Sequence, residues 1–404
     1  MELKPGYKQT EVGVIPEDWE VKSLGQIMEY IKGFPFKADD YQSHGIRVLR
    51  VSDTTYDGIR EGGGIYIDEK KAKSCLKWSL KEGDLIVSTV GSKPPMYSSM
   101  VGKVTFIQAR DSGSLLNQNA VILRGRSSSI AIQRVLHNHF RQGRYLKYIE
   151  KIFRGNANQA SITLRELFEY RIPFTPFGAE QEAIAEALSD ADALIESLEQ
   201  LIAKKRQIKQ GAMQELLTGK KRLPGFSGEW EVKSLGEIAS AIKGSQLHSG
   251  EVIQDGRYVY LNGGISPSGY IEKANTPANT IAVSEGGNSC GYVQFMEEPY
   301  WCGGHCYSIV QQYVDNRFLF QALKAQQSFI MGLRVGSGLP NVQKSALLSF
   351  KVCYPTDREE QIAIANILSD MDVEIKALDA KLIKAWQIKQ GMMQNLLTGK
   401  IRLV

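Results

Sequence analysis

The chain has 404 residues, of which 43% are hydrophobic and 23% charged, and its net charge at pH 7 is +5. This composition excludes the disordered and fibrous classes, and the length permits two or more domains with cores of their own. The polar N-terminus lacks an apolar signal core, no apolar run could span a membrane, and the five cysteines show no paired framework. We therefore expect a cytoplasmic protein without a membrane partner, whose charge permits nucleic-acid binding without requiring it.

Two sequence segments are each repeated once in the chain. The motif PEDWEVKSLG at Pro16–Gly25 returns as GEWEVKSLG at Gly228–Gly236, with Trp230 lying 211 positions after Trp19. A repeat of this kind indicates that the chain has two equivalent halves. It decides the architecture before any prediction of single helices or strands.

The second repeat has a different offset. QIKQGAMQELLTGK at Gln207–Lys220 returns 180 positions later as QIKQGMMQNLLTGK at Gln387–Lys400, and the match extends upstream to Glu180 and Glu360. The unequal offsets imply that the segments between the repeats differ in length. The chain thus alternates a variable segment and a repeated segment, twice.

The variable segments show short apolar runs broken by glycine, which are typical of strands. The runs in the two segments are Ile46–Val51, Leu85–Val90, Val101–Ile107 and Ala120–Leu123, then Tyr258–Leu261, Thr280–Ser284, Tyr292–Phe295 and Tyr307–Val310. Each segment also contains one amphipathic helical pattern, near Ala131–Glu150 and near Asn316–Leu333. We predict two similar α+β globules that are mostly sheet.

The repeated segments predict long helices. From Gln181 to Leu217 there is no proline, and Gly211 is the only glycine. Apolar residues recur in alternating steps of four and three at Ile184, Leu188, Ala191, Ile195, Leu198 and Ile202, and at Ile364, Leu368, Met371, Ile375, Leu378, Leu382 and Ala385. This heptad spacing indicates a coiled coil, and each helix would be about 57 Å long. Beyond Ile202, Lys205 and Lys209 occupy heptad positions, and the apolar stripe shifts to Ile208 and Leu216.

Two packings of these helices are open: each could pack on its own globule, or the two could pack on each other. Their matching length and register favour an antiparallel coiled coil that separates the globules with pseudo-two-fold symmetry. The predicted divisions are 1–178 and 223–357 for the globules, and 179–222 and 358–404 for the helices. The fold class is therefore α+β.

Catalytic motifs are not evident. The chain has no GxxxxGK[ST] loop, HExxH pair or glycine-rich dinucleotide fingerprint, and Lys93-Pro-Pro-Met96 lacks the features of a [DN]PP[FY] motif. His137-Asn-His139 spells HNH, but it lies in a helical pattern. Cys302-Gly-Gly-His-Cys306 offers three zinc ligands without a regularly spaced fourth, so buried thiols beside a turn are the preferred interpretation. We expect no catalytic residues and no metal site.

The polar loops of the globules are better suited to binding. Basic side chains pair with phosphates or guanine, amides can read adenine, and glycines allow close approach. The candidate DNA-binding residues in the first globule are Lys32, Lys37, Ser52, Asp53, Thr54, Ser88, Ser92, Lys93, Tyr97, Arg154, Asn156, Asn158 and Gln159, and those in the second are Lys243, Ser245, Gln246, Asn262, Ser284, Asn288, Ser289, Arg334, Ser337 and Asn341. Ordinary solvated loops contain the same residue types, but two unlike globules at a fixed separation suit two half-sites on one duplex.

The lead-in YKQTEVGVIPEDWE, the helix entry EEQIAIANILSDMD and the run LLTGK followed by RLPGFSGEWEVKSLGEI resemble the specificity subunit of type I restriction-modification enzymes. The resemblance covers essentially the whole chain. It implies that each globule is a target-recognition domain reading half of a split, asymmetric sequence in double-stranded DNA. It also implies that the helices dock two methyltransferase subunits, and that two motor-nuclease restriction subunits join the complex.

The resemblance further implies that S-adenosylmethionine, ATP and Mg are bound by the partner subunits, with no cofactor in this chain. Candidate docking residues are polar positions shared by both helix copies: Gln207, Lys209, Gln210, Gln214, Gln387, Lys389, Gln390 and Gln394. A solvated helix face is the alternative for these residues. Two other functions remain open: a specificity subunit whose modification and cleavage activities lie in one fused polypeptide, and a coiled-coil scaffold that binds proteins or carbohydrate.

Overall fold

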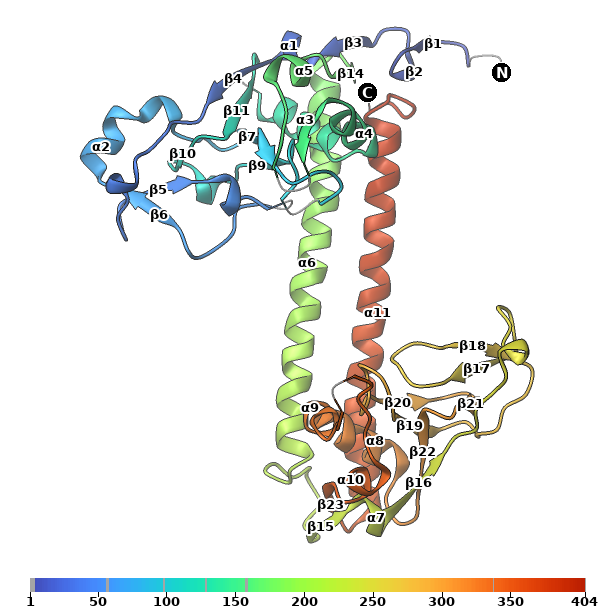
Figure 1. Ribbon diagram of the computed structural model, residues 1–404. Helices are drawn as coiled ribbons and strands as arrows, with labels where there is room; N and C mark the ends of the chain where they lie inside the picture. Colours follow the sequence, from blue (N-terminus) through green and yellow to red (C-terminus); the bar gives the residue numbers. More distant parts are fainter. Residues whose placement is uncertain are drawn as a thin grey trace. The chain divides into compact units, whose positions relative to one another are not determined.

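The computed structural model describes residues 4–55, 58–96, 99–127, 129–156, 159–336 and 338–403. For residue 249 it describes the backbone only. Tyr97, Asn158 and Ser337 lie outside these residues. The chain divides into two compact units, Met1–Ser197 with Leu382–Val404, and Leu198–Lys381. We call residues 4–177 of unit 1 head 1, and residues 223–357 of unit 2 head 2. Figure 1 labels their elements.

Head 1 is built on an antiparallel sheet of order β4-β11-β7-β9. Its strands are β4 (Met28–Lys32), β7 (Leu85–Ser88), β9 (Val104–Phe106) and β11 (Ala120–Gly125). Alternate residues of these strands, such as Leu85, Val87 and Leu123, join the apolar core beneath α3 (Ile130–Phe140) and α4 (Gly143–Ile152). This alternation follows from the two-residue period of a strand.

The other elements of head 1 form smaller sheets and short helices. The strands are β1 (Tyr7–Thr10), β2 (Gly13–Pro16), β3 (Glu20–Ser23), β5 (Ile46–Leu49), β6 (Ile65–Ile67), β8 (Val90–Gly91), β10 (Leu115–Leu116), β12 (Arg154–Asn156), β13 (Gln159–Ser161) and β14 (Arg171–Phe174); the helices are α1 (Leu24–Ile27), α2 (Glu69–Ser74) and α5 (Leu164–Phe168); and 3-10 turns cover Ala38–Asp40, Val51–Asp53, Leu76–Trp78 and Ala109–Asp111. The pair β14-β3 connects the beginning of head 1 with its end.

Head 2 repeats this plan with a sheet of order β16-β22-β19-β20. Its strands are β15 (Trp230–Ser234), β16 (Ala239–Lys243), β17 (Tyr258–Leu261), β18 (Gly269–Ile271), β19 (Thr280–Ser284), β20 (Val293–Met296), β21 (Tyr300–Cys302), β22 (Cys306–Gln311) and β23 (Lys351–Pro355); its helices are α7 (Leu235–Ile238), α8 (Asn316–Ala325), α9 (Gln327–Gly332) and α10 (Lys344–Leu348); and a 3-10 turn covers Ser249–Glu251. The prediction of two similar α+β domains is therefore confirmed.

Several predicted elements have different bounds in the structure. The strand expected at Val101–Ile107 begins at Val104, because Gly102 adopts a left-handed φ of 76°. The single helix expected in each segment is two helices, α3 and α4 in head 1 and α8 and α9 in head 2. In head 1 the backbone becomes extended at Gln142, which separates α3 from α4. In head 2 the break falls at Gln326, which caps the end of α8 and the beginning of α9.

The two long helices are α6 (Gly178–Leu216) and α11 (Arg358–Leu396), each of 39 residues. In unit 1, Ile184 and Leu188 of α6 share one apolar cluster with Met393 and Leu396 of α11. In unit 2, Met213 and Leu216 of α6 share a cluster with Leu368 of α11 and with the core of head 2. The helices thus run antiparallel within each unit, and they also pack on the head of that unit. Both packings left open by the sequence occur together.

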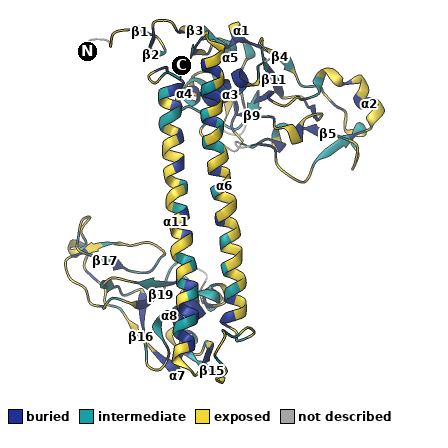
Figure 2. Cartoon of the chain, turned by 180° about the vertical axis from the view of Figure 1, so that it is seen from behind, coloured by how far each residue is buried: buried dark blue, intermediate teal, exposed yellow. Residues whose placement is uncertain are grey.

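Buried and exposed residues alternate along both long helices (Figure 2). The predicted seam of α6 is buried at Ile184, Leu188, Ile195 and Ile202, but Ile208 is 48% exposed and Met213 is buried in its region. Lys205 and Lys209 keep their seam positions through ion pairs, with Nζ of Lys209 lying 2.5 Å from Oδ1 of Asp372. The prediction that Ile208 continues the stripe was wrong, because charged pairs replace apolar contacts there.

Each long helix ends at a glycine packed against a tryptophan. Gly219 and Gly399 have φ values of 68° and 67°, a conformation that L side chains adopt only with strain. A Cβ atom would lie 3.0 Å from the Trp230 ring at Gly219, and 2.6 Å from Pro16 Cδ at Gly399. The repeated Thr-Gly-Lys therefore meets the repeated tryptophan motif at an equivalent junction in each unit.

Candidate nucleic-acid interface

Five candidate residues of head 1 gather around the small sheet of order β12-β13-β8. These are Ser92, Lys93, Arg154, Asn156 and Gln159. Arg154 Nη2 pairs with Glu166 Oε1 at 2.8 Å, and Lys93 Nζ lies 5.8 Å from the centre of the Phe153 ring. All but the half-buried Ser92 are exposed, so this sheet presents cationic and amide groups together.

Lys32 lies at the end of β4, beside a concavity of about 560 Å³. The same concavity is lined by Thr89, Gln118 and Asn119, and by Thr163, which follows β13. Gln118 and Asn119 were not among the sequence candidates. The Ile-Lys-Gly repeat marks Lys32 in the sequence, but strand pairing is needed to bring these two residues to it.

The candidate residues of head 2 gather at one end of its main sheet. Lys243 ends β16, and its Nζ lies 2.8 Å from Oε1 of Glu285, which follows β19. The backbone at Gly286 bridges to Asn341, which also bridges to Val335 next to Arg334. Arg334 and Asn341 are exposed, so this end of the sheet carries charged and amide groups from four separate segments.

The remaining candidates of head 2 lie around the β21–β22 turn and the loop after β19. Gln246 and Asn262 pack against Gly304 and Gly303, where a Cβ atom would lie 2.9 and 2.5 Å from their Oε1 and Oδ1 atoms. Ser245 and Asn288 are exposed, whereas Ser289 is half-buried. The absence of side chains at Gly303 and Gly304 thus allows the Asn262 and Gln246 side chains to pack closely against this turn.

Other candidates are buried or lie on separate loops. Asp53, Thr54, Ser88 and Ser284 are at most 7% exposed. The Asp53 carboxylate accepts hydrogen bonds from Arg50 at 2.9 and 3.1 Å, and the Thr54 carbonyl accepts one from Lys103 at 2.6 Å. We leave these four out of the proposed interface, because their side chains are not accessible to a duplex. Lys37 and Ser52 are exposed beside 3-10 turns.

The candidate docking residues on the long helices divide into two groups. The glutamines are all exposed: Gln207, Gln210, Gln214, Gln387, Gln390 and Gln394. The lysines Lys209 and Lys389 instead pair across the helices, Lys209 with Asp372 in unit 2 and Lys389 with Asp192 in unit 1. Because Lys389 is only 2% exposed, its ammonium group serves helix pairing and not a docking surface.

The two motifs with possible catalytic or metal chemistry lie in structural positions. Cys302 and Cys306 are buried whereas His305 is exposed, and within the described residues no three His, Cys, Asp or Glu side chains form a group that could hold a metal ion. His137 and His139 lie in α3, and the Phe106 ring centre is 5.6 Å from that of His137.

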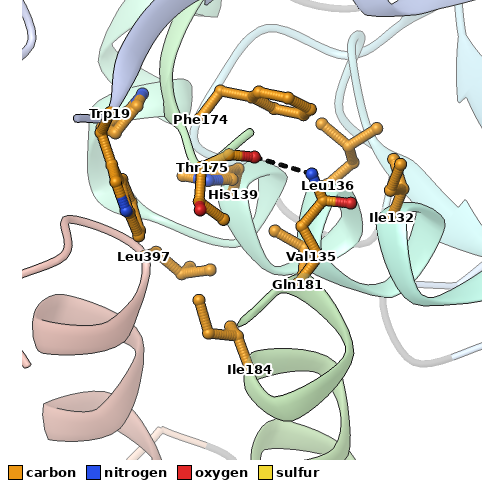
Figure 3. Close-up of a pocket in the computed structure, with 11 residues that line it drawn as sticks. Trp19, Ile132, Val135, Leu136, His139, Phe174, Thr175, Gln181, Ile184 and Leu397 are labelled. Atoms are coloured by element: carbon orange, nitrogen blue, oxygen red, sulfur yellow. Dashed lines mark hydrogen bonds between the residues drawn. The ribbon is translucent and has the colours of Figure 1, made fainter. Parts of the chain in front are cut away.

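A small gap lies where head 1 meets the beginning of α6 in unit 1 (Figure 3). Its walls include Trp19, Leu136, His139 and Ile184, and its volume is about 10 Å³. Gln181 spans one side, with its Nε2 donating to the Thr175 carbonyl at 2.7 Å. A gap of this size holds at most one water molecule, so it is a packing feature and not a ligand site.

The buried His139 and the half-buried His137 predict acid sensitivity of unit 1. Burial lowers the pKa of His137 and His139 from 6.5 to about 3, with smaller contributions from Arg141 and Lys389 for His137 and from Arg144 for His139. The unfolded chain takes up protons below about pH 6.5, whereas the folded chain does so only near pH 3. Stability is therefore full above pH 6.5 and falls by about 1.4 kcal/mol per pH unit for each histidine as the pH decreases.

Hydrogen exchange of the full chain at pH 7 and pH 5 measures this effect separately in each unit. The double variant His137→Gln/His139→Gln should lose most of the pH dependence of unit 1. Both histidines of unit 2, His248 and His305, are exposed, so unit 2 is the internal control. Equal acid destabilisation of both units would contradict the assignment.

Comparisons with known proteins identify one family that shares this two-headed organisation. The type I restriction modification DNA specificity domain matches the chain twice, at residues 16–208 and 227–385. A putative type I restriction enzyme MjaX specificity subunit of Methanocaldococcus jannaschii is 29% identical over 430 aligned positions, covering 98% of this chain and 97% of its own length. A putative type I specificity subunit of Mycoplasma genitalium is 35% identical over 158 residues, covering 38% of this chain and 41% of its own.

Among solved structures, the S subunit of a type I restriction-modification system from M. genitalium is similar to this chain with a TM-score of 0.69. It is 19% identical, and the match covers 98% of each chain, which shows that the fold is shared. No helix in the described ranges is both long and apolar enough to cross a bilayer. The family match spans most of the chain, and each of its two copies covers one head and much of the long helix that follows, so the chain belongs to the family of type I restriction-modification specificity subunits.

Proposed function

We propose that this chain is the DNA-reading subunit of a type I restriction-modification complex and supplies no catalytic group itself. Each head reads one half of a split sequence in duplex DNA, and α6 with α11 sets the spacing and docks methyltransferase subunits. The observation that carries the proposal is the presence of two heads of one topology whose accessible loops carry different polar side chains. Two heads that recognised the same half-sequence would carry the same side chains in their loops. Loops with different side chains instead suit a target whose two halves differ.

Cationic and amide groups support DNA as the ligand of both heads. Lys93, Arg154 and Asn156 in head 1, and Arg334 and Asn341 in head 2, are exposed side chains of the types that contact phosphates and base edges. S-adenosylmethionine, ATP and Mg belong to the partner subunits in this proposal. Methyltransferase and motor-nuclease subunits, two of each, complete the complex.

Replacing residues 1–177 by the first segment of another family member should change one half of the recognised sequence and leave the other half unaltered. The measurement is methylome sequencing of a host that expresses the chimera with the methyltransferase subunits of this system. The reciprocal exchange of residues 223–357 is the matched control. A change in both halves from either exchange would contradict independent reading by the two heads.

Partner docking is supported by an exposed apolar stripe on α6. Leu201 and Ile208 lie seven residues apart in the unit 2 part of α6 and are 38% and 48% exposed, and Leu194 in the unit 1 part is 54% exposed. Residues seven apart lie on one face of a helix, so this stripe forms a second seam beside the one that faces α11. Val373, Ile383 and Ile388 are also exposed on α11. Exposed apolar stripes of this kind fit helices from a partner protein.

The variant Leu201→Glu/Ile208→Glu should lose co-purification with the methyltransferase subunits while the chain stays folded, because both side chains already face solvent. A matched variant, Gln210→Glu/Gln390→Glu, tests the glutamine face, since Gln210 lies on the side of α6 opposite Ile208. Loss of assembly in the second variant alone would place docking on the glutamines. Normal assembly of both would refute docking through either surface.

A further inference from the structure

The main sheets of the two heads end in equivalent positions that carry different chemistry. Val121 of β11 lies opposite Lys32 and Val87, and Tyr307 of β22 lies opposite Lys243 and Val283. This register makes Lys32 equivalent to Lys243. The same register places Thr89 and Glu285 one residue after the equivalent Ser88 and Ser284.

The glycine after each lysine supports this equivalence. A Cβ atom on Gly33 would lie 1.8 Å from the Asn117 carbonyl oxygen, and one on Gly244 would lie 2.3 Å from the Cys302 carbonyl oxygen. No side chain fits at either position, so the loop that precedes β11 or β22 crosses the end of β4 or β16 in the same way. The residues of these loops are therefore comparable site by site.

In head 1 this sheet end is the concavity of about 560 Å³ lined by Lys32, Thr89, Gln118 and Asn119. The Thr89 hydroxyl donates to the Asn119 carbonyl at 2.9 Å, which holds the backbone of Asn119 at its positive φ of 70°. Lys32, Gln118 and Asn119 are exposed, and none of their side chains has a hydrogen bond or ion pair to another described residue. Two amides and one ammonium group thus face the opening.

In head 2 a carboxylate occupies the equivalent place. Glu285 Oε1 accepts hydrogen bonds from Lys243 Nζ and from the Tyr307 hydroxyl, both at 2.8 Å. Its other oxygen, Oε2, is buried and has no hydrogen-bond partner among the described residues. Gly304 and His305 replace the amides of Gln118 and Asn119, because β22 begins at Cys306 where β11 begins at Ala120. In head 2 the lysine and the carboxylate therefore bind each other, whereas the amides of head 1 face the opening.

We propose that the sheet end of head 1 is a base-reading site, in which Gln118 and Asn119 read an adenine edge. This inference rests on the proposed function and assigns residues to it. An amide can donate to N7 and accept from N6 of adenine. Lys32 binds an adjacent phosphate, whereas the equivalent Lys243 of head 2 is held by Glu285.

The test uses the full chain with the methyltransferase subunits of its system and selection of bound sequences from a randomised duplex pool. The variant Gln118→Ala/Asn119→Gly removes both amides, and glycine keeps the positive φ at position 119. It should reduce preference for one adenine by about tenfold or more and leave the other half-site unchanged. Gln108→Ala, on an exposed glutamine elsewhere in head 1, should leave both halves unchanged.

The second arm addresses Lys32. Lys32→Ala should weaken binding to all sequences and reduce its salt dependence without changing the motif. A changed motif in Lys32→Ala would contradict the assignment of this lysine to a phosphate.

The outcomes separate this inference from the proposed function. Selection of a split motif by the wild type, with both halves unaltered in the amide variant, would overturn the assignment of the head 1 sheet end and leave DNA reading in place. Selection of no motif by the wild-type complex would overturn the proposed function itself. Loss of preference confined to one half in the amide variant is the expected result.

Discussion

The substitution Gly399→Ala should destabilise unit 1 by about 2–4 kcal/mol, because two costs add. Gly399 has a φ of 67°, which is strained for alanine. The new Cβ would also lie 2.6 Å from Pro16 Cδ and 3.2 Å from the Trp19 ring, so a buried proline must move. Hydrogen exchange at the junction of β2 and the end of α11 measures the loss in free energy of opening.

The chain contains its own controls for this prediction. Gly211 and Gly391 are repeat-equivalent glycines inside α6 and α11, and a Cβ atom added at either would meet nothing within 4 Å. Alanine at either position should stabilise its helix by about 0.5–1 kcal/mol, since it restricts the unfolded chain and removes no contact. Gly219→Ala should be destabilising like Gly399→Ala but less so, because its nearest contact is 3.0 Å away. A neutral effect of Gly399→Ala would refute the role assigned to the Thr-Gly-Lys turn.

The substitution Trp19→Phe should cost about 1.5–3 kcal/mol more than the equivalent Trp230→Phe. Trp19 Nε1 donates to Oε2 of Glu180 at 3.1 Å, and Glu180 is only 1% exposed. Trp230 Nε1 is buried and has no hydrogen-bond partner in the described part of the chain. Both changes shrink an indole to a phenyl ring, so the difference between them reports the hydrogen bond to the carboxylate.

The glutamates at the two junctions differ in their other partners. Glu180 accepts from Trp19, from the Thr175 hydroxyl at 2.6 Å and from Arg402. Glu360 is bound by Arg222 through two contacts of 2.6 Å. Urea unfolding monitored by hydrogen exchange in each unit measures both variants in the full chain. Equal losses for Trp19→Phe and Trp230→Phe would show that the Trp19 hydrogen bond adds no net stability.

The repeated helices were predictable because their signals are local. Heptad spacing, the absence of proline and the closing glycine all act within a few turns of one helix, and the seam residues Ile184, Leu188 and Leu368 are buried as expected. The expected antiparallel pairing is present inside each unit. The polar positions of the same helices were less predictable, since only the neighbouring helix decides whether a lysine such as Lys389 faces Asp192 or solvent.

The loop residues show the limit of sequence reasoning more clearly. Asp53 and Ser88 have the composition of a binding loop, yet both are buried. Gln118 and Asn119 lack any mark in the sequence, and the concavity beside Lys32 forms only when β4, β7 and β11 pair. Pairing joins residues that are far apart along the chain, so composition within one segment cannot report it.

The sequence by itself determined the duplication, the α+β class, the two long helices and the family, because repeats and heptads are patterns of residues along the chain. The tertiary structure alone decided which polar groups are accessible and which are bound by other groups within the same unit. It also revealed that Lys32 and Lys243 occupy equivalent strand ends with an amide pair beside one and Glu285 beside the other. Burial and strand register depend on the whole fold of each head, and they are what separates a reading surface from a solvated loop.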